Sequence, residues 1–209
     1  MLPLENVRVL GLAHSACGQS CAIVLGDLGA EVIRVEQVIE SDPTPARNAT
    51  SAEWGTELGE AHEAPSRNKR SIALDFRRAE ARKMVYSIAE SADVLVEDLR
   101  PGIAVRLGID YQTLQKINPR LVHCAICEYD QRGPHEDMTG HPMNHVAMID
   151  AQRGFGRSSP DTSCLIADYC GGLYATTRIL TALLGREKTG RGQYVEITIA
   201  DTVLPLELL

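Results

Sequence analysis

The chain has 209 residues, of which 21 are Lys or Arg and 28 are Asp or Glu, so its net charge is −7. Its 44% hydrophobic and 23% charged content is ordinary for a globular protein and excludes a mainly disordered or fibrous chain. The acidic balance and the 4% aromatic content argue against a nucleic-acid binder. No apolar run is long enough to span a membrane and no signal peptide is evident, so we expect a cytoplasmic protein.

The first 36 residues predict a strand–helix–strand unit. Residues 7–12 form a buried apolar run, 21–29 have helical character, and 31–36 are rich in β-branched residues. A unit of this length places its two strands side by side and parallel.

The rest of the chain continues this alternation. We expect further strands at 71–74, 93–96, 121–126 and 194–199, and helices at 78–92, 105–117 and 167–186. The polar stretches 37–65 and 128–161 lack periodicity, and the first of them is a candidate lid over a site. The prediction is an α/β protein with an open, mainly parallel sheet and helices on both faces.

The six cysteines predict no disulfide framework, because a chain of this length without a signal peptide keeps its thiols reduced. Cys124 and Cys127 have C-x-x-C spacing, but they end an apolar run that is typical of a strand. We interpret them as small buried residues rather than as a zinc or redox site, and we expect no metal.

Several basic residues flank the predicted strands: Lys69 stands just before the strand at 71–74, Arg77 and Arg100 follow strands, and Arg106 comes shortly after Arg100. Ligands of parallel α/β folds bind beyond the carboxyl ends of the strands, and clustered cations there suit phosphate groups. The cluster consists of Lys69, Arg77, Arg100 and Arg106. Taken singly, each of these residues is an ordinary surface charge; together they favour a nucleotide-like ligand. A nicotinamide or flavin cofactor is disfavoured, because the loop after the first strand lacks the G-x-G-x-x-G pattern.

Two side chains are candidates for acid–base chemistry. His141 stands in a loop between Gly140 and Pro142, and Asp168 stands at the expected start of the long helix. A carboxylate at a helix N-terminus is favoured by the helix dipole. The alternatives are a helix N-cap for Asp168 and a surface loop position for His141.

Six segments, in this order, resemble the class III CoA-transferase family, which includes formyl-CoA transferase, the carnitine CoA-transferases and α-methylacyl-CoA racemase. They are LPLENVRVLGL, LGDLGAEVIRVE, NKRSIALDF, ADVLVEDLRPGIAVRLGI, INPRLVHCAI and ADYCGGLYATTRILTALLGREKTGRGQYVEITIAD. They extend from residue 2 to residue 201, with gaps in the two polar stretches. The resemblance implies a Rossmann-like large domain over 1–209 that binds coenzyme A as an acyl-CoA substrate.

The resemblance also implies which residues contact CoA. Carried over position by position, these contacts are Ala16, Cys17, Leu74, Arg77, Asp98, Leu99, Arg100 and Arg106. One departure is Gln37, which stands where family members usually carry an arginine.

The same resemblance assigns the catalytic carboxylate to Asp168. In the transferases this aspartate accepts the acyl group and then carries CoA, whereas in the racemases it is one of two bases. Transferases tend to have Gly-Tyr where this chain has Gly140-His141, and racemases have Gly-His. We therefore expect a racemase or epimerase that moves the proton α to the thioester between Asp168 and His141, because inversion needs two bases on opposite sides. A CoA-transferase with Asp168 as covalent carrier is the alternative.

A third hypothesis follows from length, because family chains run well past 300 residues. The resemblance covers only the large domain and leaves the small domain outside this chain. We expect a homodimer, or a heterodimer with a chain that supplies the missing domain. A CoA-binding subunit without catalysis of its own therefore stays open.

Overall fold

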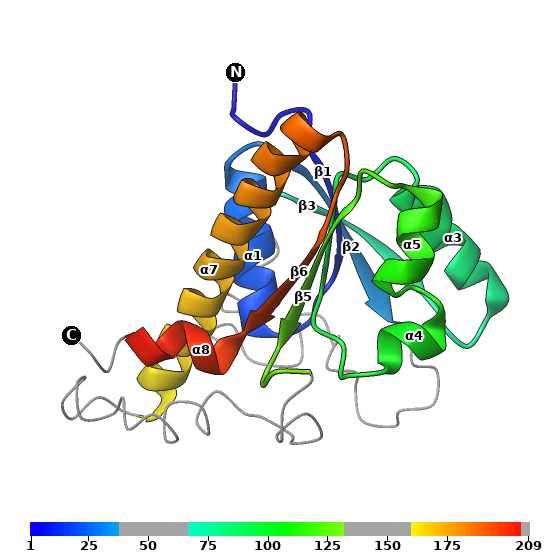
Figure 1. The fold of residues 1–209 in the computed structure, drawn as a ribbon. Helices are drawn as coiled ribbons and strands as arrows, with labels where there is room; N and C mark the ends of the chain where they lie inside the picture. Colours follow the sequence, from blue (N-terminus) through cyan, green and yellow to red (C-terminus); the bar gives the residue numbers. More distant parts are fainter. Residues whose placement is uncertain (38–66, 132–159, 206–209) are drawn as a thin grey trace.

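A computed structural model describes residues 1–37, 67–131 and 160–205, with side chains in the last range described from residue 166 onward (Figure 1). Its centre is a six-stranded sheet in the order β3-β2-β1-β4-β5-β6, in which every neighbouring pair is parallel. The strands are β1 Arg8–Leu12, β2 Glu31–Gln37, β3 Lys69–Leu74, β4 Val94–Glu97, β5 Val122–Cys127 and β6 Tyr194–Thr198.

Helices cover both faces of this sheet, as Figure 1 shows. On one face lie α1 and α7, with α8 packed against α7; on the other lie α3, α4 and α5. The helices are α1 Ala16–Asp27, α3 Ala79–Ala89, α4 Ile103–Leu107, α5 Tyr111–Ile117, α7 Pro160–Thr189 and α8 Ile199–Val203. The predicted α/β class and the Rossmann-like architecture are confirmed, and the strand order is that of the dinucleotide-binding folds.

Two apolar cores lie on the two faces of the sheet. Because side chains alternate along a strand, Val9 joins the core under α1 and α7, and its neighbour Leu10 joins the core under α3 and α5. All four residues of β4 and all six of β5 are buried. Strands buried on both faces are mainly apolar, which is why the sequence shows runs here, interrupted by Glu97 and His123, instead of alternation.

The same alternation separates the two cysteines of the C-x-x-C pair. Cys124 belongs to the core under α1 and α7, whereas the Cys127 thiol lies on the other face and accepts a hydrogen bond from Gln131. Both are buried and unoxidised. The interpretation of this pair as small buried residues is confirmed.

The stretch 105–117 is mostly helical, as expected, but it is divided between two short helices. Gly108 ends α4 with a φ of 71°, a backbone conformation that side-chain-bearing residues avoid. Asp110 then starts α5, and its carboxylate accepts a hydrogen bond from the amide of Thr113 at 3.1 Å. A glycine followed closely by an aspartate therefore marks a helix end and a new start.

Two further boundaries differ from the expectation. Helix α1 begins at Ala16, five residues earlier than predicted, because the Ser15 hydroxyl caps it by accepting from Gly18 N. The sequence analysis did not predict α8. The candidate lid over 37–65 lies almost entirely outside the described residues.

Helices α1 and α7 touch through two glycines. A Cβ on Gly171 would lie 2.7 Å from the Cys17 sulfur, and a Cβ on Gly172 would lie 2.8 Å from the Cys17 carbonyl oxygen and collide with the Ser20 hydroxyl. Backbone atoms of α1 occupy the space that a side chain would need. The two glycines therefore set how closely α7 approaches α1.

In the described part of the chain, no helix combines the length and the apolar character needed to cross a membrane.

This contact predicts a contrast between two glycines of α7. Gly172→Ala should lower the free energy of unfolding by about 2–3 kcal/mol, since a rigid backbone must move to admit the methyl group. Gly185→Ala is the matched control, because its Cβ would meet nothing within 4 Å, and it should raise that free energy by about 0.5–1 kcal/mol. Urea denaturation measures both. Equal effects of the two substitutions would contradict the close contact.

Candidate functional site

The crevice beyond β1 and β4 is the place where this sheet can hold a ligand. The chain runs from β1 toward β2 and β3 on one side and returns to β4 on the other, so the strand order reverses between β1 and β4. Open α/β sheets bind their ligands at this switch point, outside the carboxyl ends of the strands. Here the segment between β1 and α1 meets the segment between β4 and α4.

Asp98 joins these two segments. Its carboxylate accepts hydrogen bonds from the backbone amides of His14, at 2.8 Å, and Ser15, at 2.5 Å. Charge-assisted bonds of this kind hold a loop firmly. The structure thus brings Asp98 close to the start of α1, where Ala16 and Cys17 lie, and Asp98 shapes the crevice wall. A direct contact of Asp98 with CoA stays a prediction.

Cys17 contributes no exposed atoms of its side chain to this crevice. The residue is fully buried as the second residue of α1. Burial, and after it the nearby charge of Asp168, raise the pKa of its thiol far above the usual value. The thiol therefore stays neutral and is a poor nucleophile, and any contact of Cys17 with a ligand would use its backbone.

The segment after β4 presents three of the predicted CoA residues. Leu99 is half-buried, and its amide donates to Glu97 Oε2 at 2.7 Å. Arg100 is exposed, and Arg106 is exposed in the last turn of α4. Both guanidinium groups are available to an anionic ligand that approaches from solvent.

The remaining predicted CoA residues lie after β3, at the same edge of the sheet. Leu74 ends the strand and is buried on the α3 side. Arg77 is exposed and donates two hydrogen bonds to Asp75, from Nε to Oδ1 at 2.8 Å and from Nη2 to Oδ2 at 3.0 Å. Because β3 lies two strands from β1, this group stands roughly 10 Å to the side of the crevice. Only an extended ligand can reach both places.

Lys69 belongs to the predicted basic cluster but lies differently. Its ammonium reaches the carbonyl oxygen of Gln19 on α1, at 3.4 Å, and the side chain is half-buried. Burial, followed by the positive charges of Arg34 and Arg67, lowers the pKa of Lys69 to about 8. Its charge is therefore the most easily changed in the basic cluster.

Asp168 does not begin the long helix, and the expectation that it does is wrong. Helix α7 starts at Pro160, so Asp168 lies in its third turn and is not its N-cap. The N-terminal dipole of α7 therefore does not act on this carboxylate directly, because that effect fades within the first turn.

The position of Asp168 is set by the packing of α7 against α1 and not by the start of the helix. Its carbonyl oxygen lies 3.4 Å from the Ser20 hydroxyl, and its carboxylate is close enough to Cys17 to shift the thiol pKa. Asp168 is half-buried. The long helix thus carries a partly solvated carboxylate to the first turns of α1, beside the crevice.

His141 lies outside the described residues, as does most of the second polar stretch. The structure therefore neither supports nor contradicts its pairing with Asp168.

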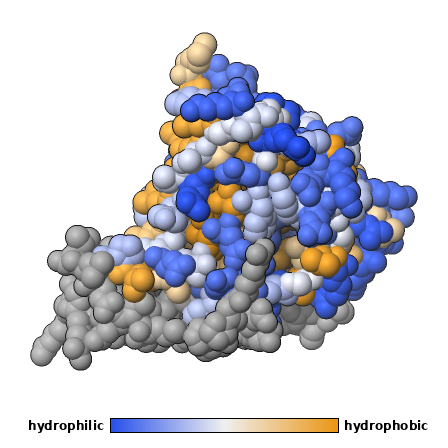
Figure 2. Space-filling view, in the orientation of Figure 1, coloured by the Kyte–Doolittle hydropathy of each residue, from blue (hydrophilic) through white to orange (hydrophobic). Residues whose placement is uncertain are grey.

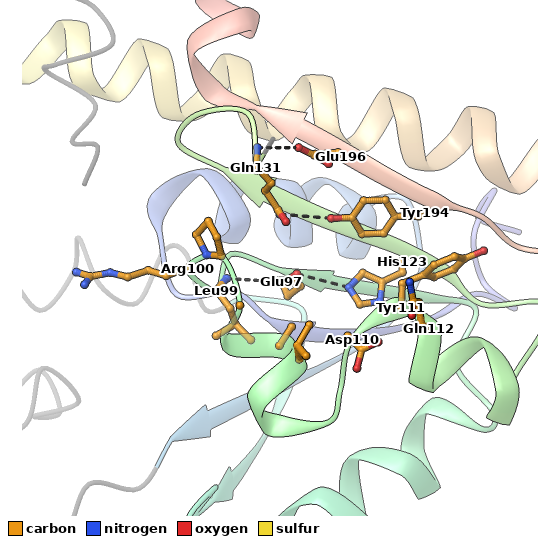
Figure 3. A pocket seen from close by; sticks show the side chains of 14 residues that line it. Glu97, Leu99, Arg100, Asp110, Tyr111, Gln112, His123, Gln131, Tyr194 and Glu196 are labelled. Atoms are coloured by element: carbon orange, nitrogen blue, oxygen red, sulfur yellow. Dashed lines mark hydrogen bonds and ion pairs between the residues drawn. The ribbon is translucent and has the colours of Figure 1, made fainter. Parts of the chain in front are cut away.

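A pocket of about 270 Å³ adjoins the crevice on the α4 side (Figure 3). Its lining includes Glu97 and His123, which are both buried and face each other at 3.5 Å, Nε2 to Oε1. The sequence analysis missed these two residues. The signal was a charged or polar residue inside each of two apolar runs, but pairing them requires the β4–β5 register, which local sequence does not provide.

Comparison with known proteins identifies the family. A family model described as CoA-transferase family III matches residues 4–207. The chain belongs to this family. It is 35% identical to the β subunit of succinyl-CoA–L-malate CoA-transferase from Chloroflexus aurantiacus, over 97% of this chain and 50% of that one. It is 31% identical to mouse succinyl-CoA:glutarate CoA-transferase, over 97% of this chain and 46% of the mouse protein.

A solved structure agrees with this assignment. The crystal structure of a CAIB/BAIF family protein from Brucella suis matches with a TM-score of 0.85 and 31% identity, over 98% of this chain and 55% of that chain. The chain thus spans about half the length of the relatives it matches. The resemblance inferred from the sequence motifs is confirmed at the level of the family.

Proposed function

We propose that this chain is the CoA-binding part of an enzyme that transfers CoA between carboxylic acids, with Asp168 as the covalent carrier. The observation that carries the proposal is the position of Asp168. Helix α7 holds this half-buried carboxylate beside the first turns of α1, at the crevice between β1 and β4. Two relatives named as CoA-transferases, of about 31–35% identity, support transfer over proton exchange as the first reading.

The proposed reaction needs one carboxylate nucleophile. A carboxylate oxygen of Asp168 attacks the thioester carbonyl, and the C–S bond breaks. CoA leaves as a thiolate, and the acyl group stays on Asp168 as an acyl–aspartyl anhydride. The thiolate then attacks the aspartyl carbonyl and releases the first acid as a carboxylate. The resulting aspartyl–CoA thioester passes CoA to a second carboxylate by the reverse steps. No proton is gained or lost overall.

The CoA nucleotide is proposed to lie along the carboxyl edge of the sheet. Arg100 and Arg106 are exposed there without a carboxylate partner among the described residues, which suits phosphate groups. Ala16 and Cys17 would contribute backbone, with Leu74 and Arg77 further along the edge. The relatives named above are named for succinyl-CoA, so succinyl-CoA is the first donor to test.

A second candidate function is racemisation at the carbon α to the thioester. It rests on Gly140-His141, which stands where the racemases of the family carry Gly-His. In this reaction Asp168 and His141 would each serve one face of an enolate. The third candidate, a CoA-binding subunit without catalysis, shares the nucleotide site and lacks both reactions.

A partner chain is part of the proposal. Tyr169, Leu173, Tyr174 and Leu184 are large apolar residues exposed on α7. Figure 2 shows apolar surface along this side of the molecule, where α7 lies in Figure 1. An exposed apolar face of this kind favours packing against another chain. Relatives named as α and β subunits of one CoA-transferase support such an assembly.

CoA binding should depend on Arg106. Arg106→Ala removes a charge-assisted phosphate contact, which should weaken CoA binding by about 1.5–3 kcal/mol, or roughly 10- to 100-fold. Arg178→Ala is the matched control, since Arg178 is an equally exposed arginine on α7. Isothermal titration calorimetry with CoA measures both variants. Unchanged affinity in Arg106→Ala would overturn this placement of the nucleotide.

Transfer and racemisation are separated by two variants measured in two assays. Asp168→Asn keeps the shape of the side chain and removes the nucleophile, so CoA transfer from succinyl-CoA to malate or glutarate should fall by at least about 10²-fold. His141→Ala should leave transfer unchanged. Deuterium exchange at the α-carbon of a 2-methylacyl-CoA provides the second assay, in which we expect no exchange.

Other outcomes of these two assays would favour one of the other two candidate functions. If exchange occurs and either substitution abolishes it, the racemase reading replaces the transferase reading. If the wild-type chain binds CoA but performs neither reaction with any family partner, the subunit without catalysis is the correct reading.

A further inference from the structure

The pocket between the sheet and α4 adjoins the crevice at Leu99 and Arg100 but lies on the other side of the sheet from Asp168. Glu97, His123 and Tyr194 line it from β4, β5 and β6. Glu97 and His123 stand in register with the face that packs on α3 and α5, whereas α7, which carries Asp168, covers the opposite face. A ligand in this pocket is therefore separated from Asp168 by the sheet.

Buried hydrogen-bond acceptors line the pocket. Glu97 Oε2 accepts from the Leu99 amide, and Glu97 Oε1 faces His123 Nε2 at 3.5 Å. With the ring neutral and its proton on Nε2, toward Glu97, Nδ1 is an acceptor. Nδ1 is buried, it has no hydrogen-bond partner in the described part of the chain, and His123 is only 1% exposed. A buried acceptor without a partner destabilises the protein until a donor reaches it.

Glu196 adds a second carboxylate, which can accept a further hydrogen bond. Its Oε1 accepts from the Gln131 amide at 3.2 Å, and no hydrogen bond joins its Oε2 to a described residue. The neighbouring Tyr194 hydroxyl accepts from the Gln131 side chain. Burial and the charge of Glu196 raise the pKa of Tyr194, so this phenol stays neutral.

Three rings surround these acceptors. The centroids of Tyr111, His123 and Tyr194 lie 5.6–6.0 Å from one another, and all three residues line the pocket. Ring faces attract cations through their quadrupole, most strongly where water is excluded. The aromatic cluster and the carboxylates therefore favour the same kind of ligand.

Positive charge is nearly absent from this lining. Among the described residues that line the pocket, three are carboxylates, Glu97, Asp110 and Glu196, and one is a cation, Arg100. Figure 3 shows the Arg100 side chain extending away from the other labelled residues. Anionic ligands, including the dicarboxylates for which the relatives are named, meet repulsion here.

We propose that this pocket is a binding site for a small organic cation that carries a protonated amine. The ammonium N–H groups bond to Glu196 Oε2 and to the unpaired Nδ1 of His123, and the adjoining carbons lie against the tyrosine rings. The site does not use Asp168; it shares Leu99 and Arg100 with the proposed CoA site, and it would stand if the proposed transfer reaction were wrong.

Three probes of equal carbon chain length test the charge preference. 1,4-Diaminobutane, 1,4-butanediol and succinate share a four-carbon chain and differ in charge. Titration of the chain, followed by NMR shifts of the Tyr194 and His123 rings, should show saturable binding of the diamine at least about tenfold tighter than the diol, and no binding of succinate. Equal shifts with the diol and the diamine, or saturation by succinate, would overturn the proposal.

Two variants test the location. Glu196→Gln keeps the bond from the Gln131 amide and removes the charge, so it should weaken diamine binding about tenfold. Val105→Arg places a cation at an exposed lining position, 68% exposed, where it should block the diamine without disturbing the core. Glu187→Gln, on exposed α7 surface, is the control and should bind as wild type does. Unchanged affinity in the first two variants would exclude this pocket as the site.

Discussion

The contact between α1 and α7 is the constraint on which the proposed chemistry depends. Gly171 and Gly172 have no side chains, so α7 lies directly against the backbone of α1 at Cys17 and Cys21 and against the Ser20 hydroxyl. That approach places Asp168, one turn earlier on α7, beside the start of α1. Any side chain at these glycines would push the carboxylate away from the crevice. The proposed catalytic role of Asp168 therefore depends on how closely α7 packs against α1.

The parallel sheet organises everything else around this contact. All six strands end at one edge, so segments distant in sequence supply the two walls of the crevice, and Asp98 joins them through two backbone amides. The alternation of side chains then divides the molecule into two faces. One face holds Asp168 and the buried Cys17, Cys21 and Cys124, and the other holds the acceptor-lined pocket. A single chain can thus present two chemically opposite sites, one basic at its rim and one acidic inside.

Local sequence predicts the strands of this fold well, because short apolar runs such as those of β1, β4 and β5 can be recognised without distant information. The helix boundaries were harder to place. The break at Gly108 depends on a left-handed backbone conformation, and the early start of α1 depends on a cap by Ser15. Most of the predicted ligand residues could be named from motifs, since they follow strands that the pattern also reveals.

Features that depend on register or packing could not be predicted in the same way. Asp168 was expected to begin a helix, because the polar residues before it hide the first turns of α7. Glu97 and His123 are 26 positions apart and face each other only because β4 and β5 pair in one register. The pairing of Arg77 with Asp75 likewise shows that a cation near the site is not necessarily a free one. Side-chain partners, more than backbone elements, are what the structure adds.

Mass spectrometry of the trapped intermediate tests the central claim most directly. The chain, with any family partner it requires, is incubated with succinyl-CoA in the absence of an acceptor acid, quenched, digested and mapped. The account predicts CoA linked as a thioester to the peptide that contains Asp168, released by hydroxylamine and absent from Asp168→Asn. Transfer that proceeds with CoA attached to another residue, or undiminished in Asp168→Asn, would contradict it.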